Sequence, residues 1–306
     1  MWGNLQIIFT DEAADGVNLN HLKKSPWAKY YHNTYCPSLW DKFETHETLF
    51  GVKIFRTDFL HFFNHNIGLI FASQSLMAHY SRSSQVPNNS IFHVTWQCHN
   101  KDFHLDSNWA KKKYYELLLA FKNKYRIKIF SYCFMSNHPH ITGFSPSQKN
   151  LSDYFRAVNS LYARHYNKTC QWRGQLVMDR FKSPIIEDSL SHLDVMHYID
   201  LNPIRVKMIA HPKLYKWSSY RHYAYGEIDP LLDEPDCYTY LGKYPEERQK
   251  RYQEMVELIL KLDWKGKKDY SVSLYIGNPE WVQKKYETLL IFNKNRFDRR
   301  PLPQPP

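Results

Sequence analysis

Two histidines near the middle of the chain are spaced so that they could hold one metal ion. They are His138 and His140, in the segment SNHPHI at residues 136–141, which follows an apolar run at residues 129–135. Residues i and i+2 of an extended strand project to the same face, so the two imidazoles would lie side by side. Neutral imidazoles in this arrangement bind divalent metals. The chain has 16 histidines, however, so a chance pair of this kind is also expected.

Segments on both sides of this pair decide how it is interpreted. Four of them occur in the order typical of one family, and a fifth closes the region: Ile91–Thr95, Phe134–His140, Gln171–Ser183, His197–Arg205 and Tyr215–Tyr220. Together they make residues 88–225 resemble the single-tyrosine HUH transposases, in particular the REP-associated group that is similar to insertion sequence 200. The resemblance implies an α+β fold, with a ferredoxin-like antiparallel sheet, helices on one face, and a small C-terminal helical extension.

The resemblance also assigns roles to individual residues. Tyr198 occupies the position of the nucleophilic tyrosine, and Asn202 that of a polar third metal ligand beside His138 and His140. Residues four apart on a helix project from one face, which is consistent with joint use of Tyr198 and Asn202. Two other tyrosines, Tyr162 and Tyr166, are rivals for the nucleophile, although their spacing on an apolar helix face favours core packing.

The activity that the resemblance implies is cleavage and rejoining of single-stranded, hairpin-forming DNA. A tyrosine oxygen attacks the scissile phosphate and keeps the bond energy as a 5′-phosphotyrosine, while the departing strand carries a 3′-OH. A divalent cation would polarise the phosphate as a Lewis acid. Two imidazole nitrogens and one oxygen suit Mg²⁺ or Mn²⁺ better than a closed structural zinc site.

Pro139 is the one departure from the family motif, whose middle residue is usually bulky and hydrophobic. Proline removes a backbone donor and fixes φ at about −65°. An alternative interpretation is therefore a catalytically inactive, domesticated protein that binds specific DNA sequences. A nuclease in which the metal activates water, with Tyr198 only structural, would use the same histidines. A metal-dependent enzyme acting on small molecules is disfavoured, because no glycine-rich phosphate loop or HExxH helix accompanies the pair.

The composition favours a polyanionic partner. Lysine and arginine number 41 against 30 aspartates and glutamates, a net charge of +11, and such an excess attracts nucleic acid. Aromatic residues make up 16% of the chain and could stack on unpaired bases. Within the family segments, we expect four basic residues to contact DNA phosphates: Arg173, Arg180, Lys182 and Arg205.

The cysteines and the hydropathy bear on location. Five cysteines lie far apart, without a CxxC pair, which favours a reducing compartment. The sequence shows no signal peptide and no apolar run long enough to span a bilayer. We therefore expect a cytoplasmic protein with no membrane partner. The family includes monomers and dimers that share active sites, so a homodimer is left open.

The elements that must position these residues follow from periodicity. A strand is expected at residues 91–97, and Asp106 or Ser107 caps a helix with an apolar face from Tyr114 to Tyr125. Two strands follow at residues 127–134 and 138–144. Asn150 is expected to cap a second helix, and a third, which carries Tyr198, begins near residue 189 or 191 and runs to Pro203.

The chain divides into four parts by composition. Residues 1–85 are unassigned, and family members begin only shortly before the first strand, so we expect Met77 to be the true start. Residues 86–225 form the HUH transposase domain. Residues 226–292 form the helical extension, with helices opening at Pro245 and after Asn278. The basic, proline-rich residues 293–306 are expected to be a disordered tail.

Overall fold

The computed structural model describes residues 85–261, 270 and 273–298, with side chains as far as residue 291. All of these fall within one compact unit, residues 69–306. The expectations for residues 1–84, including the start at Met77, lie outside the described residues. In the described part of the chain, no helix combines the length and the apolar character needed to cross a bilayer.

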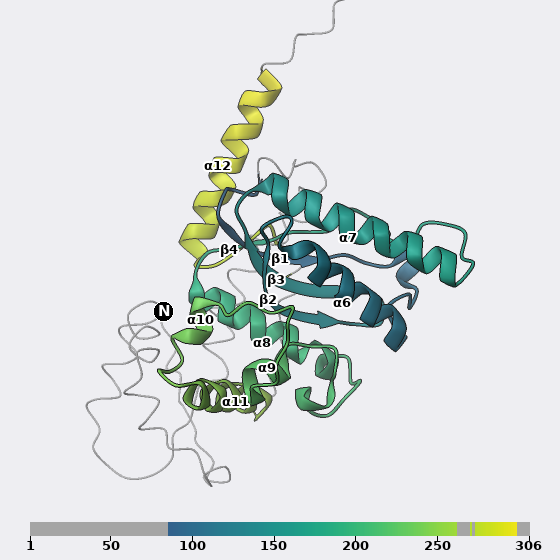
Figure 1. Ribbon diagram of the computed structural model, residues 1–306. Helices are drawn as coiled ribbons and strands as arrows, with labels where there is room; N and C mark the ends of the chain where they lie inside the picture. Colours follow the sequence, from purple (N-terminus) through teal and green to yellow (C-terminus); the bar gives the residue numbers. More distant parts are fainter. Residues whose placement is uncertain (1–84, 262–269, 271–272, 299–306) are drawn as a thin grey trace, which may run out of the picture. The chain divides into compact units, whose positions relative to one another are not determined.

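A five-stranded sheet forms the centre of the described unit (Figure 1). Its strands lie in the order β2-β3-β1-β4-β5. Their bounds are Ser90–Thr95 for β1, Lys128–Phe134 for β2, Pro139–Ser145 for β3, Ile185–Ile186 for β4 and Tyr275–Ile276 for β5. The first four pair antiparallel, and β5 pairs parallel with β4. The chain order βαββαβ with β1 and β3 in the middle is ferredoxin-like, so the predicted α+β class is confirmed.

Two helices, α6 (Asn108–Lys122) and α7 (Gln148–Thr169), cover one face of the sheet. Their buried apolar residues join those of the strands in one core, as the periodicity predicted. Ser107 caps α6 by accepting a hydrogen bond from the Ala110 N–H. The cap predicted for α7 was wrong: Ser147 is the capping residue, and Asn150 lies in the first turn, where its side chain donates to the Tyr125 carbonyl.

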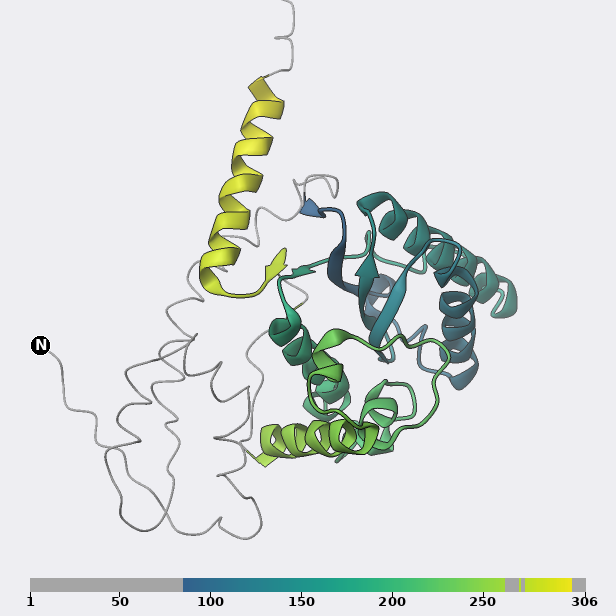
Figure 2. The ribbon, with the colours of Figure 1, turned by 60° about the vertical axis from the view of Figure 1, so that its left-hand side comes forward.

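The opposite face is covered by α8 (Ser189–Arg205), a second layer beyond the helices that were expected on one face. Figures 1 and 2 show α6 and α7 on one side of the sheet and α8 on the other. The physical reason is that β1 and β3 bury nearly every residue, and a sheet with two buried faces needs two covering layers. Pro203 does not end α8, which continues to Arg205.

The C-terminal extension is helical, as expected. After residue 226 it contains α10 (Asp236–Thr239), α11 (Pro245–Lys261) and α12 (Pro279–Asp298). The short 3₁₀ turn Pro212–Leu214 and α9 (Tyr220–Tyr225) precede it. The prediction of a disordered tail was wrong for residues 293–298, because α12 continues through them. Residues 299–306 lie outside the described residues. The addition of β5 to the sheet had no counterpart in the sequence analysis.

A buried carboxylate fixes α8 against the elements behind it. Asp200 is fully buried, and its two oxygens accept hydrogen bonds from the Ser219 hydroxyl at 3.0 Å and the Tyr252 hydroxyl at 2.7 Å. Ser219 precedes α9, and its hydroxyl also lies 3.1 Å from that of Ser131 in β2. Burial raises the pKa of Asp200 to about 7. This carboxylate therefore ties α8 to β2, to the start of α9 and to α11.

Removing one of these donors tests the importance of the tie. Tyr252→Phe leaves a buried oxygen of Asp200 without its partner, which costs about 1 to 3 kcal/mol. We expect the free energy of unfolding in urea to fall by that amount. Tyr240→Phe is the matched control, because Tyr240 is exposed, and it should change stability by less than about 0.5 kcal/mol. Equal effects of the two variants would contradict a structural role for the Asp200 cluster.

Candidate active site

The two histidines of the motif lie where β3 begins, in the centre of the sheet. His138 directly precedes β3 and is half-buried, whereas His140 is buried. Their ring centroids are 4.8 Å apart. Because Ile141 packs in the core with α6 and α7, both histidines face the opposite side, which α8 covers. The spacing argument from the sequence therefore predicted a real juxtaposition.

Each ring uses its Nδ1 atom within the protein. His138 Nδ1 lies 2.6 Å from the side-chain oxygen of Asn137, and His140 Nδ1 lies 3.0 Å from Nε2 of His93 in β1. Burial, together with the nearby His138, His93 and Arg205, lowers the pKa of His140 well below its usual value. His140 is therefore neutral at physiological pH, as a metal ligand must be.

Tyr198 projects from α8 against these rings. Its ring centroid is 5.5 Å from that of His140 and 6.1 Å from that of His93. The guanidinium of Arg205 lies 4.7 Å from the ring centroid, and the ring of Tyr270 packs edge-on at 5.0 Å. With 3% of its surface exposed, Tyr198 is enclosed by these neighbours.

Asn202 lies one turn after Tyr198 and is buried. Its side-chain N–H donates a hydrogen bond to the Tyr198 carbonyl at 2.9 Å, which orients the amide. The amide oxygen is the atom of this side chain that could ligate a metal. Among the described residues, no group of three or more histidines, cysteines or acids is placed to hold a metal. The two neutral imidazoles alone are a sparse ligand set, to which the Asn202 amide oxygen would be a third member, and such a set fits a cation that keeps open positions.

Pro139 takes its place in β3 without breaking a strand ladder. It lies opposite Phe134 of β2, whose N–H is directed away, to the Trp217 carbonyl at 2.9 Å. Opposed residues in antiparallel strands alternate between bonded and non-bonded pairs, so this pair is of the non-bonded kind. The Pro139 nitrogen therefore faces β1. The pairing of β1 with β3 ends at His140, so Pro139 has no partner residue in β1. No ladder bond is lost to the proline.

The four basic residues expected at DNA are all exposed. Arg205 reaches the Tyr198 ring, and Lys182 pairs through its backbone with Thr95, the β1 residue opposite His140. Arg180 lies two residues before Lys182 in the same extended segment. Arg173 is in a different place, next to Trp172, whose ring contacts His104. Three of the four therefore belong to elements that border the site.

The rival tyrosines lie on the other side of the sheet. Tyr162 and Tyr166 belong to α7, and both hydroxyls contact His104, through its carbonyl at 2.7 Å and its Nδ1 at 3.1 Å. Burial raises the pKa of Tyr166 to about 12. The sheet thus separates both tyrosines from the motif histidines.

The sequence analysis did not identify His93 and Tyr270 as residues of the site. The alternation of β1 puts His93 on a given face, but only the register with β3 brings it to His140. Tyr270 lies far along the chain in a polar segment without periodicity, so no sequence signal connected it with Tyr198.

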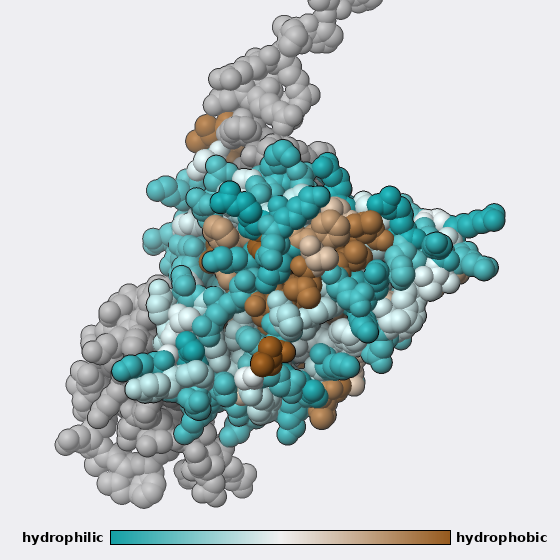
Figure 3. Space-filling model, in the orientation of Figure 1, coloured by the Kyte–Doolittle hydropathy of each residue, from teal (hydrophilic) through white to brown (hydrophobic). Residues whose placement is uncertain are grey.

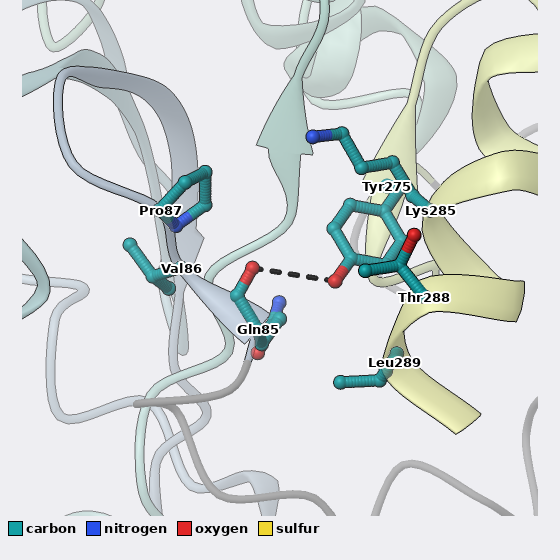
Figure 4. Close-up of a pocket in the computed structure, with 7 residues that line it drawn as sticks. All are labelled: Gln85, Val86, Pro87, Tyr275, Lys285, Thr288 and Leu289. Atoms are coloured by element: carbon teal, nitrogen blue, oxygen red, sulfur yellow. Dashed lines mark hydrogen bonds between the residues drawn. The ribbon is translucent and has the colours of Figure 1, made fainter. Parts of the chain in front are cut away.

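Other surface features lie apart from these residues. A cavity of about 170 Å³ between residues 85–87, β5 and α12 is lined by none of them (Figure 4). Its lining residues are Gln85, Val86, Pro87, Tyr275, Lys285, Thr288 and Leu289. On the face shown in Figure 3, hydrophilic residues predominate and apolar ones form several separate areas.

Part of the chain matches a known protein family. Residues 87–202 match the family model described as transposase, IS200-like. This segment is therefore similar to the IS200-like transposases. It contains the motif histidines and Tyr198 and ends at Asn202, whereas Arg205 and Tyr270 lie beyond the match.

A solved structure was also found to be similar, that of a REP-associated tyrosine transposase bound to a REP hairpin. The likeness covers 52% of this chain and 93% of that one, at 15% sequence identity and a TM-score of 0.42. No curated protein matches the chain significantly.

Replacement of Pro139 tests the geometry of the transposase motif. Because the backbone N–H of a valine at this position would form no new hydrogen bond within the sheet, Pro139→Val should not stabilise the protein. We expect a loss of about 0.4 to 1 kcal/mol in the free energy of unfolding, since valine gives the unfolded chain more freedom. Urea denaturation measures the change. A gain of about 1 kcal/mol or more would show that the proline interrupts a ladder after all.

Proposed function

We propose that the IS200-like transposase domain cleaves and rejoins single-stranded, hairpin-forming DNA through a 5′-phosphotyrosine on Tyr198. In this proposal His138, His140 and Asn202 hold a divalent cation, Mg²⁺ or Mn²⁺. The observation that carries the proposal is the packing of Tyr198 against His140, from a helix and a strand that are distant in the sequence.

The chemistry follows from the groups around Tyr198. The phenol loses its proton as its oxygen forms a bond to phosphorus, and the bond to the 3′ oxygen breaks, so that this oxygen leaves as a hydroxyl. The Arg205 guanidinium stabilises the negative charge of the phosphodiester beside the Tyr198 ring. A bound cation would polarise the phosphate as a Lewis acid. Attack of a 3′-OH on the phosphotyrosine reverses these bond changes and joins strands.

The substrate follows from charge and from the comparison. A net charge of +11 and the exposed Arg180, Lys182 and Arg205 favour a polyanion at the site. The similar solved structure holds a REP hairpin, and we extend a hairpin substrate to this chain as part of the proposal. Action on DNA and the widely spaced cysteines fit a cytoplasmic location. The family that the chain resembles includes both monomers and dimers that share active sites, so the proposal is compatible with a homodimer.

A second candidate function is a catalytically inactive protein that binds specific DNA sequences. The observation that favours it is the burial of Tyr198, whose ring is enclosed by Tyr270 and Arg205. This candidate predicts salt-sensitive DNA binding without cleavage at any metal concentration. A water-activating nuclease, the third interpretation, predicts cleavage without a covalent adduct.

Trapping of the covalent intermediate decides among these functions. We expect the full chain, incubated with Mn²⁺ and single-stranded hairpin DNA from the flanks of its gene, to form an adduct that survives denaturation. Peptide mapping should place the DNA on Tyr198, and Tyr198→Phe should abolish the adduct. Attachment at Tyr162 or Tyr166 would contradict the assignment. An adduct from Pro139→Val but none from the wild type would identify an inactive copy.

The histidine pair is tested by separating cleavage from binding. His138→Ala and His140→Ala should each lower the cleavage rate by about 100-fold or more, because Lewis-acid stabilisation is worth several kcal/mol. Affinity for the hairpin should stay within about threefold of the wild type, since phosphate contacts elsewhere dominate binding. Electrophoretic mobility shifts measure the affinity. Unchanged cleavage in both variants would remove the pair from the mechanism.

A further inference from the structure

A short chain of hydrogen bonds leads from the C-terminal part of the protein to a motif histidine. His93 Nδ1 lies 3.2 Å from the backbone carbonyl oxygen of Tyr270, and His93 Nε2 lies 3.0 Å from His140 Nδ1. Both rings are buried, and they stack with centroids 5.2 Å apart and planes within 20°. Three groups from β1, β3 and the segment before β5 are thus joined in series.

The direction of the hydrogen bonds follows from the first acceptor. A carbonyl oxygen only accepts, so His93 must carry its proton on Nδ1. Burial of a charged ring costs more free energy than burial of a neutral one, so the buried His93 is neutral. In a neutral His93 with its proton on Nδ1, the Nε2 atom has no proton and accepts a hydrogen bond. Its donor is the Nδ1–H of His140. The proton of a neutral His140 is thereby placed on Nδ1, and its Nε2 atom carries a free lone pair.

We propose that His93 is a positioning residue that, held by the Tyr270 carbonyl, fixes the orientation and tautomer of His140 so that Nε2 is presented to a divalent cation. The inference rests on the proposed function, because it gives His140 the role of ligand. It adds a residue that acts through its hydrogen bond to His140 rather than as a metal ligand. It also makes a residue outside the IS200-like match, Tyr270, part of the support of the site.

His138 offers a comparison within the same motif. Its Nδ1 atom lies 2.6 Å from an amide oxygen, that of Asn137, which also only accepts. Both motif rings therefore have their Nδ1 proton held by an acceptor, although the acceptors differ in kind. Support of this sort commonly fixes the tautomer and ring orientation of a metal-bound histidine, and its loss weakens metal binding by about 10- to 100-fold.

The chain contains a matched control for the burial of a histidine. His192 is buried on the same side of the sheet, with Nε2 at 3.2 Å from the Thr142 hydroxyl and Nδ1 at 3.4 Å from the Cys237 sulfur. Its two hydrogen bonds run to Thr142 and Cys237 and not to His140. A purely structural effect of losing a buried histidine should therefore appear in His192→Leu as well as in His93→Leu.

The first measurement needs no metal. Nitrogen-15 NMR of the histidine rings in the metal-free full chain should show His140 with a protonated Nδ1 and a bare Nε2. His93→Leu should shift His140 toward the other tautomer or a mixture, and His192→Leu should leave it unchanged. A wild-type His140 protonated on Nε2, or one that is indifferent to His93→Leu, would overturn the proposal whether or not the protein cleaves DNA.

The second measurement is the affinity for Mn²⁺ alone, read from the electron paramagnetic resonance of the free ion. His93→Leu should bind Mn²⁺ about 10- to 100-fold more weakly, whereas His192→Leu should stay within about threefold of the wild type. His93→Gln should recover most of the affinity, because its amide can donate to Tyr270 and accept from His140.

The outcomes separate this proposal from the proposed function. If His140→Ala abolishes Mn²⁺ binding and His93→Leu does not weaken it, the metal site stands and the role of His93 is refuted. If the wild type binds no Mn²⁺, the metal site of the proposed function fails, and the NMR measurement still decides the role of His93. Should His93→Leu fail to fold, His93→Gln and the wild-type tautomer provide the decision.

Discussion

The rotation of α8 about its own axis is the constraint on which the site depends. Asp200 sets it, because its carboxylate is bound from behind by Ser219 and Tyr252. On a helix, residues two positions apart point to nearly opposite sides. When Asp200 faces the layer formed by the start of α9 and α11, Tyr198 must face the sheet and the motif histidines. The two hydrogen bonds of Asp200, on the helix face away from the sheet, thus orient Tyr198 toward the sheet.

The strand, helix, strand, strand order could be predicted from the sequence because each element carries a local signal, whereas the ferredoxin-like sheet was implied by the family resemblance. The alternation in β1 and the apolar faces of α6 and α7 are of this kind. The second covering layer could not, since burial on both faces depends on which strands become central. The strand β5 also escaped prediction, because two residues paired with β4 are too few to show a period. The tail was misjudged on composition, because α12 continues through residue 298.

The site divides in the same way. His138 and His140 share a strand, and Tyr198 and Asn202 share a helix, so spacing alone put each pair on one face. That the two pairs meet is a property of the packing of α8, which the family resemblance supplied and periodicity could not. His93 in β1 contacts His140 in the neighbouring strand β3 as a diagonal pair, and only the register of β1 with β3 fixes this contact. Its hydrogen bond to Tyr270 spans 177 positions of sequence.

Helices on both faces of the sheet also determine the direction from which a nucleic acid can come. Neither broad surface of the sheet is open, and Tyr198 lies between a strand layer and a helix layer. The approach is left to the rim, where the strand ends, the half-buried His138 and the side chains of Arg205 and Lys182 are found. In the proposed function, the scissile phosphate must therefore reach Tyr198 from this rim, past the Arg205 and Tyr270 side chains that enclose its ring.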